Sequence, residues 1–295
     1  MNAALNAQED VAVSLVVATL GRTWQVERLF HSLAAQRGVT FDVVVVDQND
    51  DDRLLSVLQQ KWPFAIRHVP TSGERGASRA RNRGWRAARG AVILFPDDDC
   101  WYPPNFLETA LATMRERGSA VLSGRPTDET GRTINGRFEV SAQPIDVVNV
   151  WTTAIEWMVF FERAVLSSID GFDEDIGIGA ATPWQSSEIQ DIILRSIRSG
   201  YSCWYDPAIT GYHEEMVIGR PDAKLLRKAR GYARGMGFVL HAHGYSIPRQ
   251  AIWVGRPIAR AVVSLFKGRR DLLPYYSNVA IGRLEGALRR TFLND

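Results

Sequence analysis

Apolar, β-branched runs alternate with amphipathic stretches through the first half of the chain, and this alternation limits the possible folds more than any other feature. The runs predict strands at residues 11–18, 41–47, 64–69 and 91–95. Helical spacing of apolar residues lies between them, at residues 24–36, 53–61 and 77–89. Strands joined by helices of this length need crossover connections, so the sequence predicts an α/β domain with a mostly parallel central sheet.

The second half of the chain is less regular. A predicted helix at residues 105–117 and a strand at 120–123 are followed by a polar, Gly-rich run at 125–144, which predicts an irregular excursion. An aromatic segment and a Gly- and Asp-rich loop then lead to a helix and a short strand, and from Ala223 onward the sequence is helical and basic. We predict a catalytic domain at residues 1–215 and a basic helical C-terminal extension at 216–295.

Positive charge is concentrated near the C-terminus. Residues 217–295 hold 15 Lys or Arg against 4 Asp or Glu, although the whole chain has a net charge of only +2. Such a region suits an anionic surface, either phospholipid head groups or nucleic acid, and a solvated helical face is the alternative. Residues 249–270 interleave apolar and basic side chains, which predicts peripheral membrane contact. Packing of that face against the catalytic domain or a second subunit remains open.

Cysteine content and the N-terminal sequence bear on location. The chain has two cysteines, and no basic region precedes its first apolar run, which is unlike a secretory signal. No apolar stretch reaches the length that a membrane-spanning helix needs. We expect a cytoplasmic protein, with the inner face of the membrane as the surface that the basic region would contact.

Three adjacent carboxylates, Asp97, Asp98 and Asp99, follow the predicted strand at residues 91–95. They repel one another, so a fold rarely holds them at the end of a buried strand unless a cation offsets their charge. Carboxylate oxygens beside a bound diphosphate are ligands that Mg²⁺ or Mn²⁺ prefers. The triplet therefore predicts a divalent metal site, and a surface turn that caps the next helix is the alternative.

Asp47 ends another predicted strand. A carboxylate in the ligand crevice of a parallel sheet commonly accepts hydrogen bonds from a nucleoside base or ribose, although a polar turn would also explain it. The sequence ATLGRT follows the first strand and contains neither G-x-G-x-x-G nor a P-loop. A dinucleotide-binding enzyme and a Walker-type ATPase are both disfavoured.

Further polar residues flank these positions. Six arginines lie between residues 75 and 89, and their guanidinium groups, that of Arg81 among them, would complement nucleotide phosphates; a solvated helix is the alternative. Glu188 and Asp191 are spaced i, i+3 near a helix start and share a face, and His213 follows the next strand. The alternative is that the two carboxylates only interact with the helix dipole and that the histidine is structural.

The order of these elements resembles glycosyltransferase family 2, whose members have the GT-A fold. The similarity covers residues 11–215 and rests on ATLGR (18–22), VVVVD (43–47), ARNRG (80–84), FPDDD (95–99), DGFDED (170–175), SSEIQDIILR (186–195) and His213. It implies a Rossmann-like nucleotide-binding domain that transfers a sugar, with inversion, from a nucleoside-diphosphate sugar to an acceptor hydroxyl. The implied acceptor is a saccharide or a lipid-linked molecule of bacterial polysaccharide or glycolipid synthesis, and no nucleic acid is implied.

The resemblance also assigns roles by position. It places Thr19 and Asp47 at the nucleoside, Asp97 at the ribose and Asp99 at an Mn²⁺ or Mg²⁺ ion, with His213 as a further metal ligand. We add Asp98 and Arg81 to the expected nucleotide-binding residues.

Two positions depart from the family pattern. Ala18 replaces the usual proline, and Ile189 stands where the family usually has the aspartate of a Glu-Asp pair, which leaves the identity of the catalytic base open. We favour Glu188, because it matches the glutamate before the usual base and has the longer side chain. Asp191 lies one turn deeper, where it can also pair with Arg195 at i+4.

Two other functions compete with sugar transfer. A sugar nucleotidyltransferase would need a glycine-rich, lysine-containing loop after the first strand, and ATLGRTWQ has no lysine. A non-catalytic scaffold that binds a nucleotide sugar is suggested by the aspartate missing at Ile189. The sequence leaves the sugar, the nucleotide base, the acceptor and the oligomeric state open.

Overall fold

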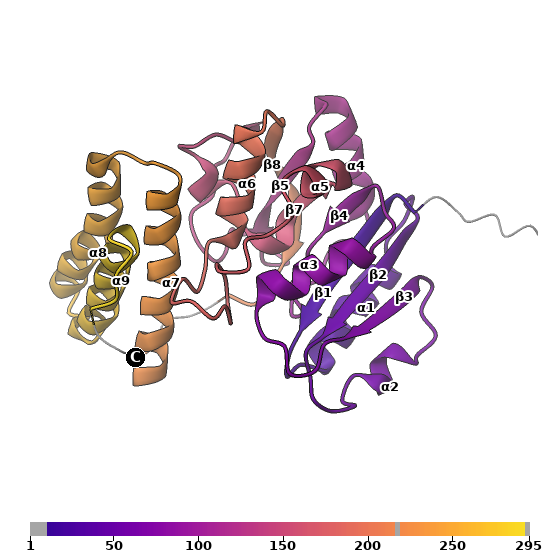
Figure 1. Ribbon diagram of the computed structural model, residues 1–295, viewed down its shortest axis with the longest axis horizontal. Coiled ribbons are helices and arrows are strands. Elements are labelled where there is room, and N and C mark those ends of the chain that lie inside the picture. The colour runs from indigo at the N-terminus through magenta and orange to yellow at the C-terminus, as the bar shows by residue number, and fades with distance from the viewer. Residues whose placement is uncertain (1–10, 216–218, 293–295) are drawn as a thin grey trace, which may run out of the picture. The chain divides into compact units, whose positions relative to one another are not determined.

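The computed structural model describes residues 11–215 and 219–292 (Figure 1). The chain divides into two compact units. The first contains the described residues up to Glu74 together with Ala80–Asp170 and Ser196–Glu214, and the second contains Arg75–Arg79, Gly171–Arg195 and the described residues from Glu215 onward. The segment at 171–195 thus shares a unit with the C-terminal helices. The predicted division into a catalytic domain at residues 1–215 and a helical extension at 216–295 stays a prediction.

The first unit is built on a sheet whose described strands follow the order β3-β2-β1-β4-β7-β5-β8-β6. Their bounds are β1 (Val13–Thr19), β2 (Phe41–Asp47), β3 (Ala65–Pro70), β4 (Val92–Leu94), β5 (Val121–Thr127), β6 (Gln143–Pro144), β7 (Val159–Glu162) and β8 (Cys203–Tyr212). Strands β1 to β4 are parallel, as are β5 and β8, whereas β7 and β6 run antiparallel to their neighbours. The predicted α/β fold with a mostly parallel sheet is confirmed.

Helices connect these strands, and the first helix shows how such a helix buries an apolar stripe. They are α1 (Trp24–Ala34), α2 (Leu55–Leu58), α3 (Ala77–Ala87), α4 (Phe106–Arg117) and α5 (Arg163–Ser168), with 3-10 turns at Val150–Thr152 and Glu156–Met158. In α1 the fully buried residues recur at i, i+3, i+4 and i+7, which is the core-facing stripe of a helix: Val26, Leu29, Phe30 and Leu33. Helix α3 needs Gly84, because a Cβ there would lie 2.2 Å from Cγ1 of Val16 in β1.

Several elements differ from the sequence prediction. The helix expected at 53–61 shortens to α2, which is anchored by buried Leu54 and Val57 and followed by Pro63. The aromatic segment, to which no strand was assigned, supplies β7, whose Val159, Phe160 and Phe161 are all fully buried. A strand covered on both faces reads as a continuous apolar run without alternation, so periodicity alone does not reveal it.

The second unit consists mainly of helices. Most of α6 (Glu188–Arg198) belongs to it, with α7 (Ala223–Ala242), α8 (Ile247–Phe266), a 3-10 turn at Arg270–Leu272 and α9 (Leu273–Ala287). Helices α7 and α9 lie side by side (Figure 1) and approach closely at glycines. A Cβ at Gly237 would lie 2.1 Å from the carbonyl oxygen of Arg283, and one at Gly286 would lie 2.1 Å from that of Arg234. The helical character predicted from Ala223 onward is therefore observed over these described residues.

A buried ionic network joins α7 to α9. Glu285 is fully buried, and its carboxylate accepts hydrogen bonds from Nε of Arg230 at 2.9 Å and from Nε of Arg234 at 2.7 Å. Burial by itself would raise the pKa of Glu285, but the two guanidinium groups outweigh it and lower the pKa to about 2. The carboxylate is thus charged in the folded protein and supplies the counter-charge for both arginines.

Glu285→Gln is expected to lower the free energy of unfolding by about 3 kcal/mol at pH 7, because it leaves two buried guanidinium groups without their carboxylate. The folded-state pKa lies below the ordinary value of 4.5, so this stabilisation is present above about pH 4.5 and is lost as the pH falls toward 2. Urea unfolding at several pH values measures both effects. Asp271→Asn, which removes an exposed partner of Arg269, is the matched control and should change stability little. Equal losses for the two variants would contradict this account.

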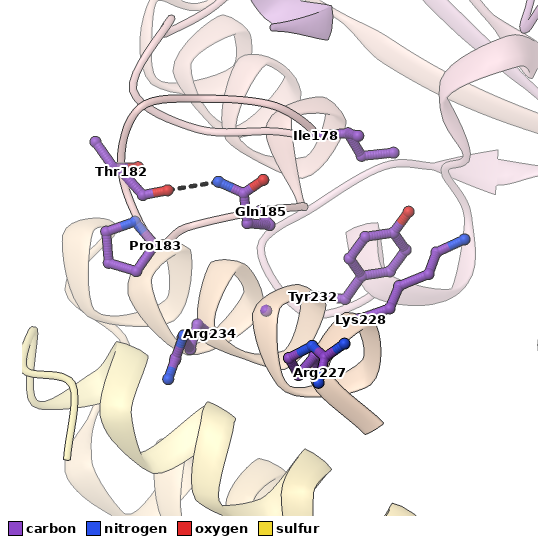
Figure 2. A pocket seen from close by; sticks show the side chains of 9 residues that line it. Ile178, Thr182, Pro183, Gln185, Arg227, Lys228, Tyr232 and Arg234 are labelled. Atoms are coloured by element: carbon purple, nitrogen blue, oxygen red, sulfur yellow. Dashed lines mark hydrogen bonds between the residues drawn. The ribbon is translucent and has the colours of Figure 1, made fainter. Parts of the chain in front are cut away.

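A pocket of about 510 Å³ opens in the second unit, between the loop at residues 178–185 and helix α7 (Figure 2). Its lining comprises Ile178, Thr182, Pro183, Gln185, Arg227, Lys228, Gly231, Tyr232 and Arg234. Nε2 of Gln185 donates to the carbonyl oxygens of Ala180 and Thr182, which fixes the loop wall. The ammonium group of Lys228 lies 5.2 Å from the ring centre of Tyr232 on the opposite wall. The pocket is large enough for a small ligand, and its charged lining is basic.

Candidate active site

The carboxyl ends of three parallel strands gather polar side chains at one edge of the sheet. Thr19 and Asp47 are the last residues of β1 and β2 and are directly paired in register. Strand β4 pairs with β1 on the other side and ends at Leu94, three residues before Asp97. This is the edge at which open α/β sheets bind their ligands.

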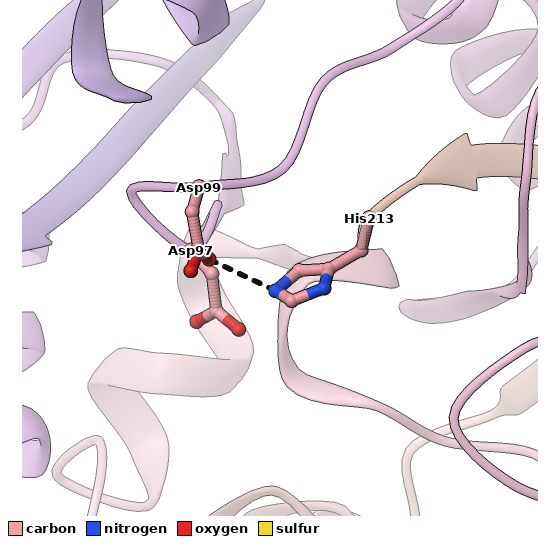
Figure 3. Close-up of side chains that lie close together, drawn as sticks. All are labelled: Asp97, Asp99 and His213. Atoms are coloured by element: carbon pink, nitrogen blue, oxygen red, sulfur yellow. Dashed lines mark hydrogen bonds and ion pairs between the residues drawn. The ribbon is translucent and has the colours of Figure 1, made fainter. Parts of the chain in front are cut away.

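Asp97, Asp99 and His213 form a cluster that could hold a metal ion (Figure 3). One ligand atom from each side chain lies within 4.8 Å of the others. His213 directly follows β8, and a backbone bridge between Trp101 and Tyr212 brings the end of that strand beside the aspartates. Two carboxylates and an imidazole are donors that suit Mn²⁺. The fold therefore brings together the predicted metal ligands Asp99 and His213 and adds Asp97.

Asp99 and His213 are already in contact. Nε2 of His213 lies 2.9 Å from Oδ1 of Asp99. Burial alone would raise the pKa of Asp99, but the contact with His213 and the charge of Arg22 lower it. Burial would likewise lower the pKa of His213, and the bond to Asp99 raises it instead. Each group thus favours the charged form of the other.

Asp98 points to a different partner. Its Oδ2 accepts a hydrogen bond of 2.7 Å from the hydroxyl of Thr19, and it does not belong to the cluster of Figure 3. Burial raises its pKa to about 6, although the bond from Thr19 opposes that shift. Two predicted nucleotide-binding residues, Thr19 and Asp98, therefore contact each other.

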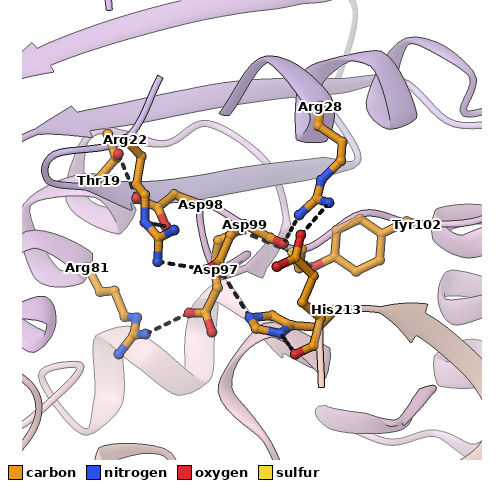
Figure 4. A network of polar contacts seen from close by, with 11 residues as sticks. Thr19, Arg22, Arg28, Arg81, Asp97, Asp98, Asp99, Tyr102 and His213 are labelled. Carbon is orange, nitrogen blue, oxygen red and sulfur yellow. Dashed lines mark hydrogen bonds and ion pairs between the residues drawn. The ribbon is translucent and has the colours of Figure 1, made fainter. Parts of the chain in front are cut away.

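Arginines surround the aspartates (Figure 4). Nη2 of Arg22 lies 2.8 Å from Oδ2 of Asp99, Nη2 of Arg28 donates to the backbone oxygen of Asp99 at 2.8 Å, and Nη2 of Arg81 lies 3.4 Å from Oδ1 of Asp97. Among these, sequence reasoning selected Arg81 alone. The triplet therefore has guanidinium groups as counter-charges, so mutual repulsion of the aspartates does not by itself require a metal ion.

The buried position of Arg81 sets it apart from its neighbours in α3. Arg81 is almost fully buried, whereas Arg83 and Arg86 are more exposed and pair with Glu74 and Asp170. The arginine run is thus divided between one buried side chain beside Asp97 and exposed ones that pair with other carboxylates.

Trp157 and Arg28 are neighbours of the cluster that sequence reasoning missed. The indole of Trp157 stacks on the ring of His213, with centroids 5.6 Å apart, and its backbone oxygen accepts a bond of 2.6 Å from the Tyr102 hydroxyl. The guanidinium of Arg28 lies 4.0 Å from the ring centre of Trp101. Trp157 lies in the 3-10 turn at Glu156–Met158, far from His213 in the sequence, and it orients the imidazole by stacking on it. No local sequence pattern predicts that contact.

Asp47 is held by local partners. Its Oδ1 accepts hydrogen bonds from the backbone and side-chain nitrogens of Asn49, at 3.0 and 2.7 Å, and its Oδ2 lies 3.0 Å from Nε2 of His68. His68 stands on the adjacent strand β3. These contacts fix the direction of the Asp47 carboxylate.

The two candidate bases belong to the second unit and differ in their surroundings. Asp191 pairs through Oδ2 with Nε of Arg195 at 2.8 Å and through Oδ1 with Nε2 of His243 at 2.8 Å. Burial would raise its pKa, but these contacts lower it. Glu188 is nearly buried at the first position of α6 and lies beside Gly177, where a Cβ would come within 3.0 Å of its carboxyl carbon. The pairing of Asp191 with Arg195 raised by the sequence is present, and His243 adds to it.

Ile189 is fully buried, as are Ile192 and Ile193 on the same helix. An aspartate at position 189 would bury a carboxylate, which costs free energy unless a partner is supplied. The departure from the family pattern is thus matched by the local packing.

The sheet is that of an α/β domain of the GT-A type, with the polar cluster at its carboxyl edge. Residues 14–164 match the family model described as Glycosyl transferase family 2. The chain belongs to this family, which confirms the resemblance noted in the sequence.

Curated relatives are similar over part of their length. An uncharacterized glycosyltransferase of Haemophilus influenzae is 25% identical over 209 residues, which cover 68% of this chain and 64% of the relative. A dolichol-phosphate mannosyltransferase of Pyrococcus furiosus is 28% identical over 130 residues, which cover 43% of this chain and 36% of the relative. The chain thus matches less than two thirds of the length of either relative.

Solved structures share the fold. TarS 1–349 of S. aureus, in complex with UDP-GlcNAc, has a TM-score of 0.56 at 17% identity, with 97% of this chain and 94% of that chain covered. The mannosyltransferase PcManGT of Pyrobaculum calidifontis, in complex with GDP-Man and Mn²⁺, has a TM-score of 0.60 at 16% identity, with 95% and 88% covered. At these identities the likeness shows the fold alone.

No described helix combines the length and apolar character needed to cross a membrane. Residues 1–10, on which the expectation of a missing secretory signal rests, lie outside the described part of the chain.

Proposed function

We propose that this protein transfers a sugar from a nucleoside-diphosphate sugar to an acceptor hydroxyl, with inversion at the anomeric carbon. The observation that carries the proposal is the cluster of Asp97, Asp99 and His213 at the carboxyl edge of the sheet, next to the paired strand ends of Thr19 and Asp47. The family and the nucleotide sugars bound by TarS and PcManGT support the same class of donor.

Asp99 and His213, with Asp97 beside them, are the residues that would hold a divalent ion. Their oxygen and nitrogen donors fit Mn²⁺, and PcManGT was solved with that ion. A bound Mn²⁺ or Mg²⁺ would offset negative charge on the diphosphate as it leaves. The side chain of Arg22 is 41% exposed. It can therefore turn from Asp99 toward a phosphate once a metal ion offsets the charge of Asp99.

Thr19, Asp47 and Asp97 would bind the nucleoside end of the donor, with Asp98 and Arg81 holding them in place. The hydroxyl of Thr19 is fixed by Asp98, and the guanidinium of Arg81 approaches Asp97. Hydrogen bonds to a base or ribose need acceptors held in fixed directions, which these contacts supply.

Glu188 is the proposed catalytic base. An inverting transfer needs a carboxylate that removes the proton from the acceptor hydroxyl. Both oxygens of Asp191 are engaged by Arg195 and His243, which suits a positioning role in the second unit. Residues 1–215 would then carry the catalytic groups, and residues 216–295 would form the helical extension.

The acceptor is proposed to be a saccharide or lipid-linked molecule in polysaccharide or glycolipid synthesis. A cytoplasmic location, with peripheral contact between residues 249–270 and the inner face of the membrane, belongs to the same proposal. Residues 249–270 include most of α8, whose sequence interleaves apolar and basic side chains.

Thermal unfolding in the presence of UDP-, GDP-, dTDP- and CDP-sugars, with and without Mn²⁺, is the first test of donor binding. At least one donor should raise the melting temperature by several degrees, and only with the metal, because a ligand at 100 times its Kd stabilises the native state by about 2.7 kcal/mol. The absence of a metal-dependent shift with any donor would overturn the proposal. Release of nucleoside diphosphate when an acceptor is added then separates an enzyme from a binding scaffold.

A further inference from the structure

Helix α8 exposes a broad apolar face. Along its 20 residues, the positions on one side of the helix carry exposed aliphatic or aromatic side chains, and Phe266 is 89% exposed. With 3.6 residues per turn, these positions fall within less than half of the helix circumference. The large members of the face are Ile247, Ile252, Ile258, Val262, Val263, Leu265 and Phe266.

Basic residues border this face along one edge. Arg249, Arg256, Arg260 and Lys267 are spaced by seven, four and seven residues, so they form a single stripe down the helix. The sequence of α8 contains no Asp or Glu. An apolar face with a basic border is the surface of a helix that lies in the head-group region of a membrane.

The third side of α8 packs inside its own unit. Pro257 and Ser264 are buried, and Nη1 of Arg283 in α9 donates to the backbone oxygen of Trp253 at 2.6 Å. The orientation of the helix is thereby fixed, and the exposed face is the part that α9 does not cover. Figure 1 shows α8 beside α9 in this unit.

Three guanidinium groups gather where the basic stripe meets α9. Arg256 lies 3.8 Å from the ring centre of Trp253, and Arg283 lies 5.7 Å from the same ring. Burial lowers the pKa of Arg283 to about 10, and the positive charges of Arg260 and Arg256 add to this shift. Within the described residues, Nε of Arg283 has no hydrogen-bond partner. Glu285, on the same helix as Arg283, pairs instead with Arg230 and Arg234. Over the described part of the chain, no carboxylate pairs with Arg256, Arg260 or Arg283.

We propose that α8 docks on an anionic phospholipid surface, with its apolar face among the acyl chains and the cluster of Arg256, Arg260 and Arg283 around a head-group phosphate. The proposal deepens the peripheral contact included in the proposed function. Guanidinium groups bind phosphate through several N–H donors at once, and one phosphate would supply the negative charge that the cluster lacks.

A second copy of the chain fits this surface less well. It would bring its own basic stripe and no acidic residue from α8, so like charges would face each other across the contact. An anionic bilayer offers both an apolar interior for the face and phosphates for the stripe. Each basic residue near such a surface strengthens binding roughly fivefold at physiological salt.

Vesicle flotation with the full-length protein tests the proposal. The protein should float with vesicles of phosphatidylcholine and phosphatidylglycerol and remain at the bottom with phosphatidylcholine alone. Phe266→Asp and the double variant Arg256→Gln/Arg260→Gln should each reduce the bound fraction at least tenfold. Val140→Asp, at another apolar side chain that is 89% exposed, and Arg37→Gln/Arg115→Gln, which removes two exposed charges elsewhere, are the matched controls and should float as the wild type does.

Failure of the wild type to float with anionic vesicles would overturn the proposal, as would equal losses in the control variants. A dimer that light scattering detects for the wild type and not for Phe266→Asp would also overturn the proposal. Donor-induced thermal shifts measure the proposed sugar-transfer site separately. A protein that keeps its donor shift but does not float refutes the membrane surface alone, and the reverse result refutes the donor site alone.

Discussion

Asp99→Asn is expected to abolish metal-dependent donor binding and to reduce sugar transfer on the order of a thousandfold. Oδ1 of Asp99 contacts His213 and Oδ2 contacts Arg22, so the side chain stands at the centre of the proposed metal cluster. Loss of one charged ligand weakens a site built from two carboxylates and an imidazole, and metal ions contribute several kcal/mol to transition-state stabilisation. Isothermal titration of the donor with and without Mn²⁺ measures donor affinity, and turnover measures the rate of sugar transfer.

The control for this variant is Asp98→Asn. It removes the same charge from the neighbouring position, but its carboxylate contacts Thr19 and lies outside the cluster. Donor binding by Asp98→Asn should remain dependent on Mn²⁺, even if the affinity changes. If Asp99→Asn kept its metal dependence while Asp98→Asn lost it, the ligand assignment would be wrong.

Glu188→Gln is expected to lower the turnover number on the order of a thousandfold while leaving donor affinity nearly unchanged. General-base catalysis contributes a factor of about 10² to 10⁴, and glutamine has the shape of glutamate without its basic oxygen. The variant keeps a polar side chain at the first position of α6, so the fold should be retained. Turnover with donor and acceptor saturating, together with titration of the donor, separates the chemical step from binding.

Asp191→Asn is the matched comparison for the base. Its carboxylate holds Arg195 and His243, so its loss should lower stability more than it lowers turnover of the folded enzyme. Thermal unfolding and turnover of the two variants side by side measure this contrast. Loss of turnover in Asp191→Asn, with an active Glu188→Gln enzyme, would reverse the two roles.

The parallel half of the sheet could be predicted because its signals are local. Strands β1, β2, β3 and β4 are short apolar runs between helical stretches, and each observed strand overlaps its predicted range. Thr19, Asp47 and Asp97 follow from the same logic, because residues at the carboxyl ends of parallel strands meet at one edge. The order of weak motifs in the sequence was enough to name the family.

The remaining features depend on contacts between distant segments. Strand β7 carries no alternation because both its faces are covered, and Trp157 reaches His213 only in the folded chain. His243 contacts Asp191 from 52 positions away, and the segment at 171–195 forms a unit with helices that follow it much later. Periodicity and spacing describe one element at a time, so none of these contacts could be predicted.

The charge of the aspartate triplet does not by itself show that a metal ion binds there. From the sequence, three carboxylates in a row indicated a metal ion as the compensating charge. The fold also brings Arg22, Arg28 and Arg81 to the same place, and arginines can perform that role. What favours a metal is the geometry of Asp97, Asp99 and His213, and their common location is visible only in three dimensions.

Anomalous diffraction at the manganese edge, from crystals grown with Mn²⁺ and a nucleoside diphosphate, tests the central claim most directly. One strong peak is expected within coordination distance of the Asp99 carboxylate and the His213 imidazole, with the nucleoside beside Thr19 and Asp47. A peak elsewhere in the chain, or a bound nucleoside diphosphate with no peak near Asp99, would contradict it.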